Sequence, residues 1–103
     1  GAADANPYIA LAAALGSGLL GIKEKLAPHA QVEGNAYEKT HHESLTLPQS
    51  LGEAANKLKN SQAANKLFGK EFVEHFSQTR LWEEREYRKH VSDWELERYF
   101  EII

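Results

Sequence analysis

The fold of this chain is set by one uncharged stretch, NPYIALAAALGSGLLGI, which runs from Asn6 to Ile22. Its beginning predicts a helix start, because Asn is a favourable N-cap and Pro7 fits the first helical position, where its missing N–H costs nothing. No charged residue occurs between Asp4 and Lys23. The stretch therefore predicts a helix that is apolar on all sides and that ends near Lys23, where a cation favours the C-terminal end of the helix dipole.

An apolar helix of this kind has three explanations. A transmembrane helix needs about 20 strongly apolar residues, and this stretch is shorter and rich in Ala and Gly. A signal peptide needs a basic amino-terminal region, whereas Asp4 is acidic. The third explanation, burial on all sides with small residues that allow close approach, is favoured. The rest of the chain is too short to cover the helix, so we expect residues 8–22 to dock on another domain and to be exposed without it.

The composition is that of one ordinary globular unit. Of 103 residues, 42% are hydrophobic and 26% are charged. A net charge of −3 favours neither nucleic acid nor an anionic membrane as a partner. The chain has no Cys, which excludes disulfides and thiolate metal sites and gives no support to a secreted module held together by disulfides. It has no Met either, from which we expect that it is part of a longer reading frame.

Residues 27–49 predict a loop. Pro28, Gly34 and Pro48 interrupt this region, and polar residues dominate between them. A loop longer than about 15 residues is unusual in a compact domain and is often either functional or disordered.

Four further helices are expected in the remainder of the chain. Three of them begin at a serine that can cap the helix, and two of these starts have the Ser-x-x-Glu spacing of a capping box. The expected helices span about residues 50–58, 61–69, 70–90 and 92–100. With no strand expected, the predicted fold is all-α, with four to five helices.

The longest predicted helix carries a rough apolar stripe at spacings of three to five residues. We expect this stripe to be core or interface, and it consists of Phe72, Val73, Phe76, Trp82, Tyr87 and Val91. Charged residues, Glu84 among them, are expected on the solvated side of the same helix.

Few side chains form a pattern that is typical of an active site. His41, His42 and Glu43 are candidate metal ligands, but a metal site needs three or four convergent groups, so a solvated loop is favoured. Ser17 lies inside a helical run, whereas a nucleophilic serine of the Gly-x-Ser-x-Gly type lies at a strand-to-helix turn. We expect no catalytic, cofactor-binding or metal-ligating residue in this chain.

Several segments, taken in order, resemble the glutamine synthetase family. The resemblance covers essentially the whole chain and is carried by Ala-Asp-Ala-Asn-Pro-Tyr at 3–8, Gly-Leu-Leu-Gly-Ile-Lys at 18–23, Asn-Ala-Tyr at 35–37, Leu-Pro-Gln-Ser-Leu-Gly-Glu-Ala at 47–54 and Asp-Trp-Glu at 93–95. In particular, the chain resembles the helical C-terminal part of the family's catalytic domain. The ending is similar to that of glutamine synthetase-like and γ-glutamylpolyamine synthetase members.

The resemblance implies a cytoplasmic, ATP-dependent carbon–nitrogen ligase. Such enzymes phosphorylate the γ-carboxylate of glutamate, and ammonia or an amine then displaces the phosphate. The family's ligands for Mg or Mn, its ATP contacts and its glutamate-binding arginines come mostly from a sheet upstream of these helices. The resemblance therefore implies that residues 1–103 buttress that sheet, that the sheet portion and other subunits of a ring are their partners, and that they are inactive alone. The alternative is a stand-alone helical interaction module without catalysis.

Two features of the family carry over to particular residues. Tyr37, in Asn-Ala-Tyr, lies where some members carry a regulatory nucleotidylated tyrosine, although Glu38 and Lys39 do not match the acidic, Pro-rich context of those members. The end of the chain corresponds to a tail that contacts other subunits, and the residues expected there are Trp94, Tyr99, Phe100, Ile102 and Ile103.

Overall fold

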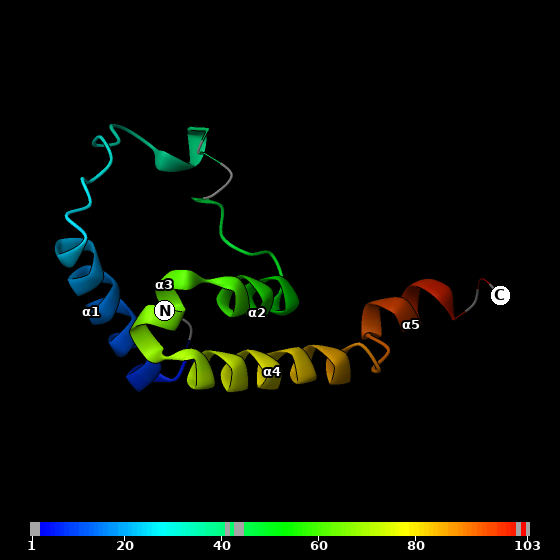
Figure 1. Ribbon diagram of the computed structural model, residues 1–103. Helices are drawn as coiled ribbons and strands as arrows, with labels where there is room; N and C mark the ends of the chain where they lie inside the picture. The colour runs from blue at the N-terminus through cyan, green and yellow to red at the C-terminus, as the bar shows by residue number, and fades with distance from the viewer. Residues whose placement is uncertain (1–2, 41, 43–44, 101, 103) are drawn as a thin grey trace.

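The computed structural model describes residues 3–40, 42, 45–100 and 102. These residues form five α-helices and one turn of 3-10 helix, with no strand among them (Figure 1). In chain order the elements are α1 (Pro7–Lys23), η1 (Ala36–Glu38), α2 (Leu51–Asn60), α3 (Gln62–Phe68), α4 (Lys70–Tyr87) and α5 (Asp93–Tyr99). The all-α prediction is therefore confirmed.

Polar caps begin the helices where the sequence predicts them. Asn6 Oδ1 accepts from the backbone N–H groups of Tyr8 at 3.0 Å and Ile9 at 3.3 Å, which satisfies two donors that have no intrahelical partner. Ser61 ends α2 and caps α3, because its hydroxyl accepts from the Ala64 N–H at 3.1 Å. The helices α2 and α3 are thus joined by a single residue.

The two predicted capping boxes differ. At α5 the box is complete: the Ser92 hydroxyl accepts from the Glu95 N–H at 3.3 Å, and the Glu95 carboxylate accepts from the Ser92 N–H at 2.8 Å. At α2 the Ser50 hydroxyl accepts from the Glu53 N–H at 3.1 Å, but the Glu53 carboxylate accepts instead from the N–H of Gln49 at 2.9 Å. The prediction of reciprocal pairing at Ser50 is wrong, since the carboxylate reaches one residue further upstream.

Two helix ends also differ from the prediction. Helix α2 continues through Asn60 and does not end at Leu58. Helix α4 ends at Tyr87 and not at His90, which leaves the exposed Val91 in the connection to α5. Helix ends carry weaker sequence signals than capped starts, and the last turn frays easily.

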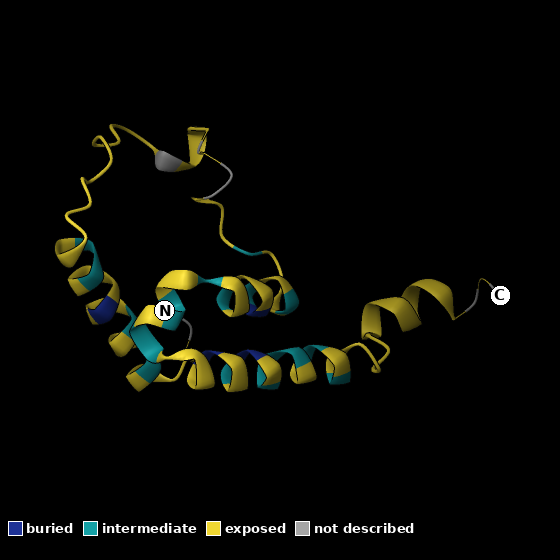
Figure 2. Ribbon diagram, viewed as in Figure 1, coloured by how far each residue is buried: buried dark blue, intermediate teal, exposed yellow. Residues whose placement is uncertain are grey.

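The core lies where α4 packs against α2, and Figure 2 shows the buried positions of α4 on the side that faces α2. Ala55 from α2 with Val73 and Ser77 from α4 are the buried residues of this contact. The Ser77 hydroxyl donates to the Glu74 carbonyl at 3.0 Å, so burial leaves it satisfied. Small side chains at the crossing allow the two helices to approach closely.

The apolar stripe predicted on α4 is only partly correct. Val73 is buried, but Trp82 is 52% exposed and Tyr87 is more exposed still. Glu84, predicted on the solvated side, is half-buried, and its side chain lies against Gly52 in the first turn of α2. The side of α4 that packs is set by the position of α2, which a count of apolar residues along one helix does not reveal.

Three aromatic rings form a row along one side of α3 and α4. The ring centroids of Phe68 and Phe72 are 5.3 Å apart, and those of Phe72 and Phe76 are 5.6 Å apart. The Arg80 guanidinium then lies 5.5 Å from the Phe76 centroid. Spacing of four residues makes this row possible on a helix surface, where each ring covers part of the next.

Helix α1 packs against α3 through its smallest residue. A Cβ at Gly16 would lie 2.7 Å from Leu67 Cδ2 and 2.9 Å from Leu67 Cγ, so only glycine fits without a shift of that side chain. An ion pair of 2.6 Å between the carboxylate of Glu24, which follows the last residue of α1, and the Lys66 ammonium of α3 adds a second contact. The side of α1 that is buried or half-buried contains Ile9, Ala13, Gly16 and Leu20.

The molecule is open and elongated. Its radius of gyration is 18.2 Å, against about 13 Å for a compact domain of this length. Its accessible surface is 9514 Å², against about 5,800 Å² for a compact monomer of this mass. Figure 1 shows two causes: an arch, made of residues 24–40 and 45–50, extends away from the helices, and α5 extends beyond the end of α4.

Candidate functional site

The outer side of α1 carries a row of exposed apolar side chains. Five large side chains there are 62 to 82% exposed, and they are Tyr8, Leu11, Leu15, Leu19 and Ile22. They follow one another at three or four residues, the spacing that places side chains on one face of a helix. We call these five residues the outer stripe.

The outer stripe and the inner side make α1 apolar on two sides. Among the helices that the structure describes, α3 packs on the inner side, and the outer stripe stays exposed. Gly16 is the single fully buried residue of α1. Residues 3–40, 42, 45–100 and 102 do not bury α1 on all sides. Burial of the outer side by a further domain stays a prediction. The prediction that residues 8–22 are exposed when no other domain covers them is confirmed for this stripe.

Tyr37 lies at the outer part of the arch and is 98% exposed. Asn35 shapes its backbone: Asn35 Oδ1 accepts from the Tyr37 N–H at 3.1 Å, and Asn35 Nδ2 donates to Glu38 Oε1 at 2.7 Å. These bonds form the single turn of η1. The phenol is accessible to a modifying enzyme, and whether it is modified stays a prediction.

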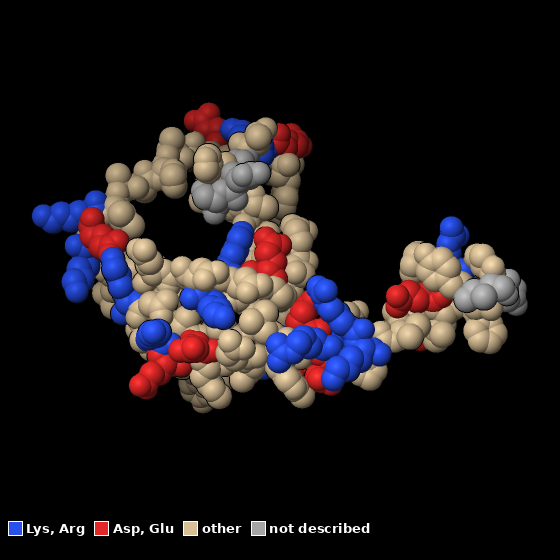
Figure 3. Space-filling model, turned by 45° about the vertical axis from the view of Figure 1, so that its right-hand side comes forward, with Lys and Arg blue, Asp and Glu red and all other residues tan. Residues whose placement is uncertain are grey.

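The arch is fixed where it meets α2. The Lys57 ammonium donates to the Thr46 carbonyl at 2.9 Å, and the Glu53 carboxylate accepts from the Gln49 N–H. Figure 3 shows an opening between the arch and the helices, which the side chains do not close. The arch therefore stands off from the helices with its α2 end held in place.

Helix α5 forms an arm whose residues are all exposed. The Trp94 and Tyr99 rings contact edge to face, with centroids 6.1 Å apart, and Phe100 and Ile102 are also exposed. Ile103, the fifth predicted contact residue, lies outside the described residues. The arm stands apart from the rest of the molecule in Figure 3, so its apolar side chains are available to a partner.

The cap of the arm has an electrostatic consequence. The Ser92 backbone N–H and the Ser92 hydroxyl both donate to the Glu95 carboxylate, each at 2.8 Å, and they hold the pKa of Glu95 below its ordinary value. The carboxylate form is the one that caps the helix.

Metal-ligating side chains do not converge in the part of the chain that the structure describes: no three His, Asp or Glu residues there form a group that could hold a metal ion. Of the metal candidates from the sequence, His42 is described, whereas His41 and Glu43 lie outside the described residues. Among the described residues, no helix has the length and apolar character needed to cross a bilayer.

Sequence reasoning missed one feature, a groove between α2, α3 and α4. It is lined by Lys59, Asn65, Lys70, Val73 and Glu74. These residues come from three helices, so no spacing along the chain could have brought them together before the fold was known.

Comparison with known proteins identifies the relatives of this chain. The family model described as "Glutamine synthetase, catalytic domain" matches residues 1–99. A glutamate–isopropylamine ligase of a Pseudomonas species is 45% identical over 98% of this chain and 22% of its own length. Type-1 glutamine synthetase 2 of Dictyostelium discoideum is 44% identical over 97% of this chain and 20% of its own length.

A glutamine synthetase of Thermococcus kodakarensis is 43% identical over 96% of this chain and 26% of its own length. No solved structure gives a significant match. The chain thus spans about a fifth to a quarter of the curated relatives it matches. The match along nearly the whole chain confirms the resemblance seen in the sequence, and the chain belongs to the glutamine synthetase family.

Proposed function

We propose that this chain is the helical C-terminal part of a longer, cytoplasmic, ATP-dependent ligase, which joins ammonia or an amine to the γ-carboxylate of glutamate through γ-glutamyl phosphate. Two relatives support the reaction class by their names, one a glutamine synthetase and the other a glutamate–isopropylamine ligase. The short span of the match on each relative supports a longer polypeptide.

The outer stripe is the observation that carries the proposed role of the chain. Covering a Leu or Ile side chain completely is worth about 1.5–3 kcal/mol, and the stripe offers Leu11, Leu15, Leu19 and Ile22 in one row. The remainder of the enzyme would cover this row while α3 holds the inner side of α1. In this role the chain buttresses the catalytic part and supplies none of the reacting groups.

The family implies ATP and Mg or Mn, and no group of metal-ligating side chains that could hold either metal converges in the described residues. We therefore assign their binding to the rest of the enzyme and derive no step of the reaction from this chain. By itself the chain is expected to be inactive.

A chimaeric enzyme tests this proposal. The segment of the Pseudomonas ligase that matches this chain is replaced by residues 1–99, and the same ligase without the segment is the control. We expect ATP-dependent γ-glutamyl transfer from the chimaera, and none from the control or from the 103-residue chain. Transfer by the 103-residue chain alone would refute the proposal that the reacting groups lie in the rest of the enzyme.

An inactive but folded chimaera, together with a native product no larger than this chain in its source cells, would favour the stand-alone interaction module. A folded state is checked by circular dichroism and by elution volume, so a misfolded chimaera is recognised as such. The mass of the native product is read with an antibody raised against residues 1–103.

We also assign the arm to contacts between subunits of a homo-oligomeric ring. Trp94, Tyr99, Phe100 and Ile102 are exposed on an element that extends away from the other helices, which is how a contact arm is built. Deleting residues 99–103 from the whole enzyme should shift its sedimentation to smaller species. An unchanged oligomer would contradict the assignment.

Tyr37 is a candidate for nucleotidylation by its place in the family motif and its exposure, but the context of Glu38 and Lys39 favours an ordinary loop tyrosine. A mass difference of one AMP between Tyr37 peptides from cells grown with ample and with scarce nitrogen would establish the modification. An unmodified peptide under both conditions would make Tyr37 an ordinary loop tyrosine.

A further inference from the structure

The start of α2 departs from the capping that its sequence favours. Ser50 and Glu53 have the spacing of a capping box, and the same spacing at Ser92 and Glu95 gives a complete box. The Ser50 hydroxyl accepts from the Glu53 N–H at 3.1 Å, which is one half of the box. The Glu53 carboxylate does not supply the other half, because it accepts from the Gln49 N–H at 2.9 Å. The two helix starts thus share a motif but differ in the position of the carboxylate.

One lysine on α2 accounts for this difference. The Lys57 ammonium donates to the Thr46 carbonyl at 2.9 Å, across 11 positions of the chain. The same ammonium lies 3.7 Å from Glu53 Oε1, while Glu53 Oε2 accepts from the Gln49 N–H. Both oxygens of Glu53 are therefore engaged outside the capping box. The residue at the same spacing in α5 is Tyr99, which offers the capping carboxylate no cation.

The two positions of the carboxylate are close in free energy. The side chains of Lys57 and Glu53 are 49% and 45% exposed, so their ion pair competes with water and contributes little. A backbone N–H is available to the carboxylate in either position, because Gln49 and Ser50 are adjacent and both are exposed. A change of partner exchanges one solvent-exposed hydrogen bond for another, and the net contribution of each is small.

We propose that the start of α2 is a two-state cap and that the Lys57 ammonium selects between the states. In the bridged state, which the structure shows, Lys57 bonds to Thr46 and attracts Glu53, and residues 46–49 are held on α2. In the capping-box state the Glu53 carboxylate accepts from the Ser50 N–H, as in α5, and residues 46–49 are released. Attachment of this end of the arch and a complete capping box therefore exclude each other.

The two states differ in the arch and not in the helix. The bond from the Glu53 N–H to the Ser50 hydroxyl is present in both states, so α2 keeps a cap when residues 46–49 are released. An anion or a high salt concentration that screens the Lys57 ammonium favours the capping-box state. All of the groups lie within residues 46–57, so this proposal does not rest on the ligase reaction.

Amide hydrogen exchange distinguishes the two states, because each state bonds a different N–H. The Gln49 N–H is bonded in the bridged state and the Ser50 N–H in the capping-box state. Solvent-exchange NMR on the ¹⁵N-labelled 103-residue chain measures both rates. We expect Lys57→Gln to speed exchange at Gln49 about fivefold and to slow it at Ser50 by a similar factor, the size for one net hydrogen bond. Unchanged rates at both amides would overturn the proposal.

Two variants of Glu53 separate a change of state from a simple loss of contact. Glu53→Gln keeps a side chain that completes capping boxes but removes the charge that Lys57 attracts, so it should reproduce the effect of Lys57→Gln. Glu53→Ala removes the acceptor, so exchange should rise at Gln49 and stay unchanged at Ser50. If Lys57→Gln gives the pattern of Glu53→Ala, the capping-box state does not form and the proposal is wrong.

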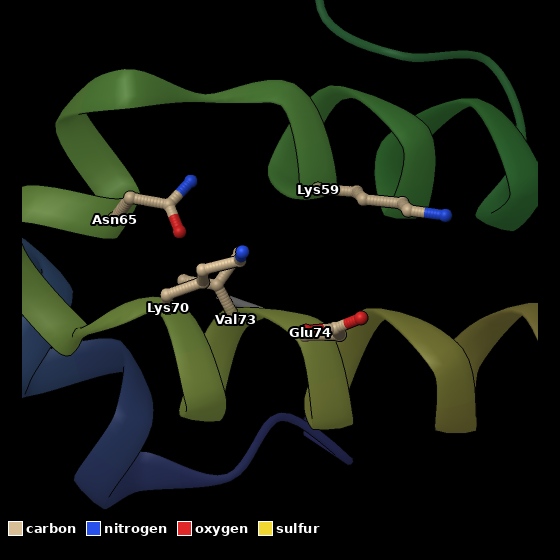
Figure 4. Close-up of a pocket in the computed structure, with 5 residues that line it drawn as sticks. All are labelled: Lys59, Asn65, Lys70, Val73 and Glu74. Carbon is tan, nitrogen blue, oxygen red and sulfur yellow. The ribbon is translucent and has the colours of Figure 1, made fainter.

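Lys59→Gln is the matched control, because it removes the same charge two residues further along α2. Lys59 lines the groove toward α4 (Figure 4), and its replacement should leave both exchange rates unchanged. Salt at about 1 M should shift the unmodified chain in the same direction as Lys57→Gln and should leave Ser92 unaffected. An equal effect of Lys59→Gln would make net charge the cause and would overturn the role of Lys57. Unchanged amide signals of α4 in every variant verify that the fold is intact.

Discussion

Helix α1 and the α2–α4 pair differ in how they bury their side chains. The pair buries three small or medium side chains, Ala55, Val73 and Ser77, and places most of its charges on the outside. Helix α1 has no charge before its last residue and covers only one of its two apolar sides. The pair is stabilised by contacts within the chain, whereas the outer stripe of α1 requires a neighbour that the chain does not supply.

The difference shows that apolar content does not measure how much core a segment contributes. Helix α1, which has no charge before its last residue, has one buried residue, while α4, which is rich in Glu, has two. Packing needs a complementary surface at the right place. An apolar helix that lacks a complementary surface within its own chain indicates association with a partner and not a contribution to the stability of the chain.

The strongest test of this comparison places the same charge in both regions. Val73→Asp puts an unpaired carboxylate into the α2–α4 contact, and we expect it to lower the free energy of unfolding by about 3 kcal/mol or more. Leu15→Asp puts the same group on the outer stripe, where it stays hydrated. We expect it to change stability by less than about 0.5 kcal/mol and to reduce self-association of the chain.

Urea unfolding measures the first quantity, and sedimentation velocity measures the second. Equal destabilisation by the two variants would mean that the outer stripe is packed in solution, and the contrast between the regions would then be wrong. In the chimaeric enzyme Leu15 would be covered. Leu15→Asp should therefore destabilise the chimaera, unlike the chain alone, and should abolish its activity.

Two glycines of α1 provide the next test, of smaller size. Gly16→Ala forces a methyl group against Leu67, and overpacking of this kind costs about 1–3 kcal/mol. Gly18 has no atom near the position of a Cβ, so Gly18→Ala should stabilise the helix by about 0.5–1 kcal/mol through lower backbone entropy in the unfolded chain. The same substitution, two residues apart, should thus change thermal stability in opposite directions.

The smallest expected effect is a pH dependence of the arm, helix α5, which has no buried residue. Because the pKa of Glu95 is lower in the folded arm than in the unfolded chain, its contribution is present above the unfolded pKa and is lost as the pH falls through the folded pKa. We expect the amide signals of residues 93–99 to lose helical shifts at acidic pH. Glu95→Gln should remove this pH dependence, while the signals of α2 and α4 serve as an internal control.

The sequence predicts the helix starts well because the signals are local. The side chains of Asn6, Ser61 and Ser92 each accept from an N–H within the next three residues, so the residue spacing alone predicts the interaction. The family motifs were also readable, since they depend on residue order and not on packing. The class of the fold and the exposure of α1 followed from these features.

The faces of α4 and the groove could not be predicted in the same way. Ser77 is fully buried although it is polar, and Trp82 is half-exposed although it is the largest apolar side chain of its helix. Both outcomes depend on where α2 crosses α4, a contact between residues about 20 positions apart that no local pattern encodes. The partner of Glu53 was missed by one residue for a similar reason, because Gln49 and Ser50 both present an N–H near the carboxylate.

The outer stripe also has a thermal consequence. Covering apolar surface lowers the heat capacity, and the free energy gained by it weakens on cooling. Whatever covers Leu11, Leu15 and Leu19 should therefore bind with a negative heat-capacity change and should release α1 in the cold before the α2–α4 pair opens. An enzyme that depends on this contact would lose activity on ice and recover it on warming.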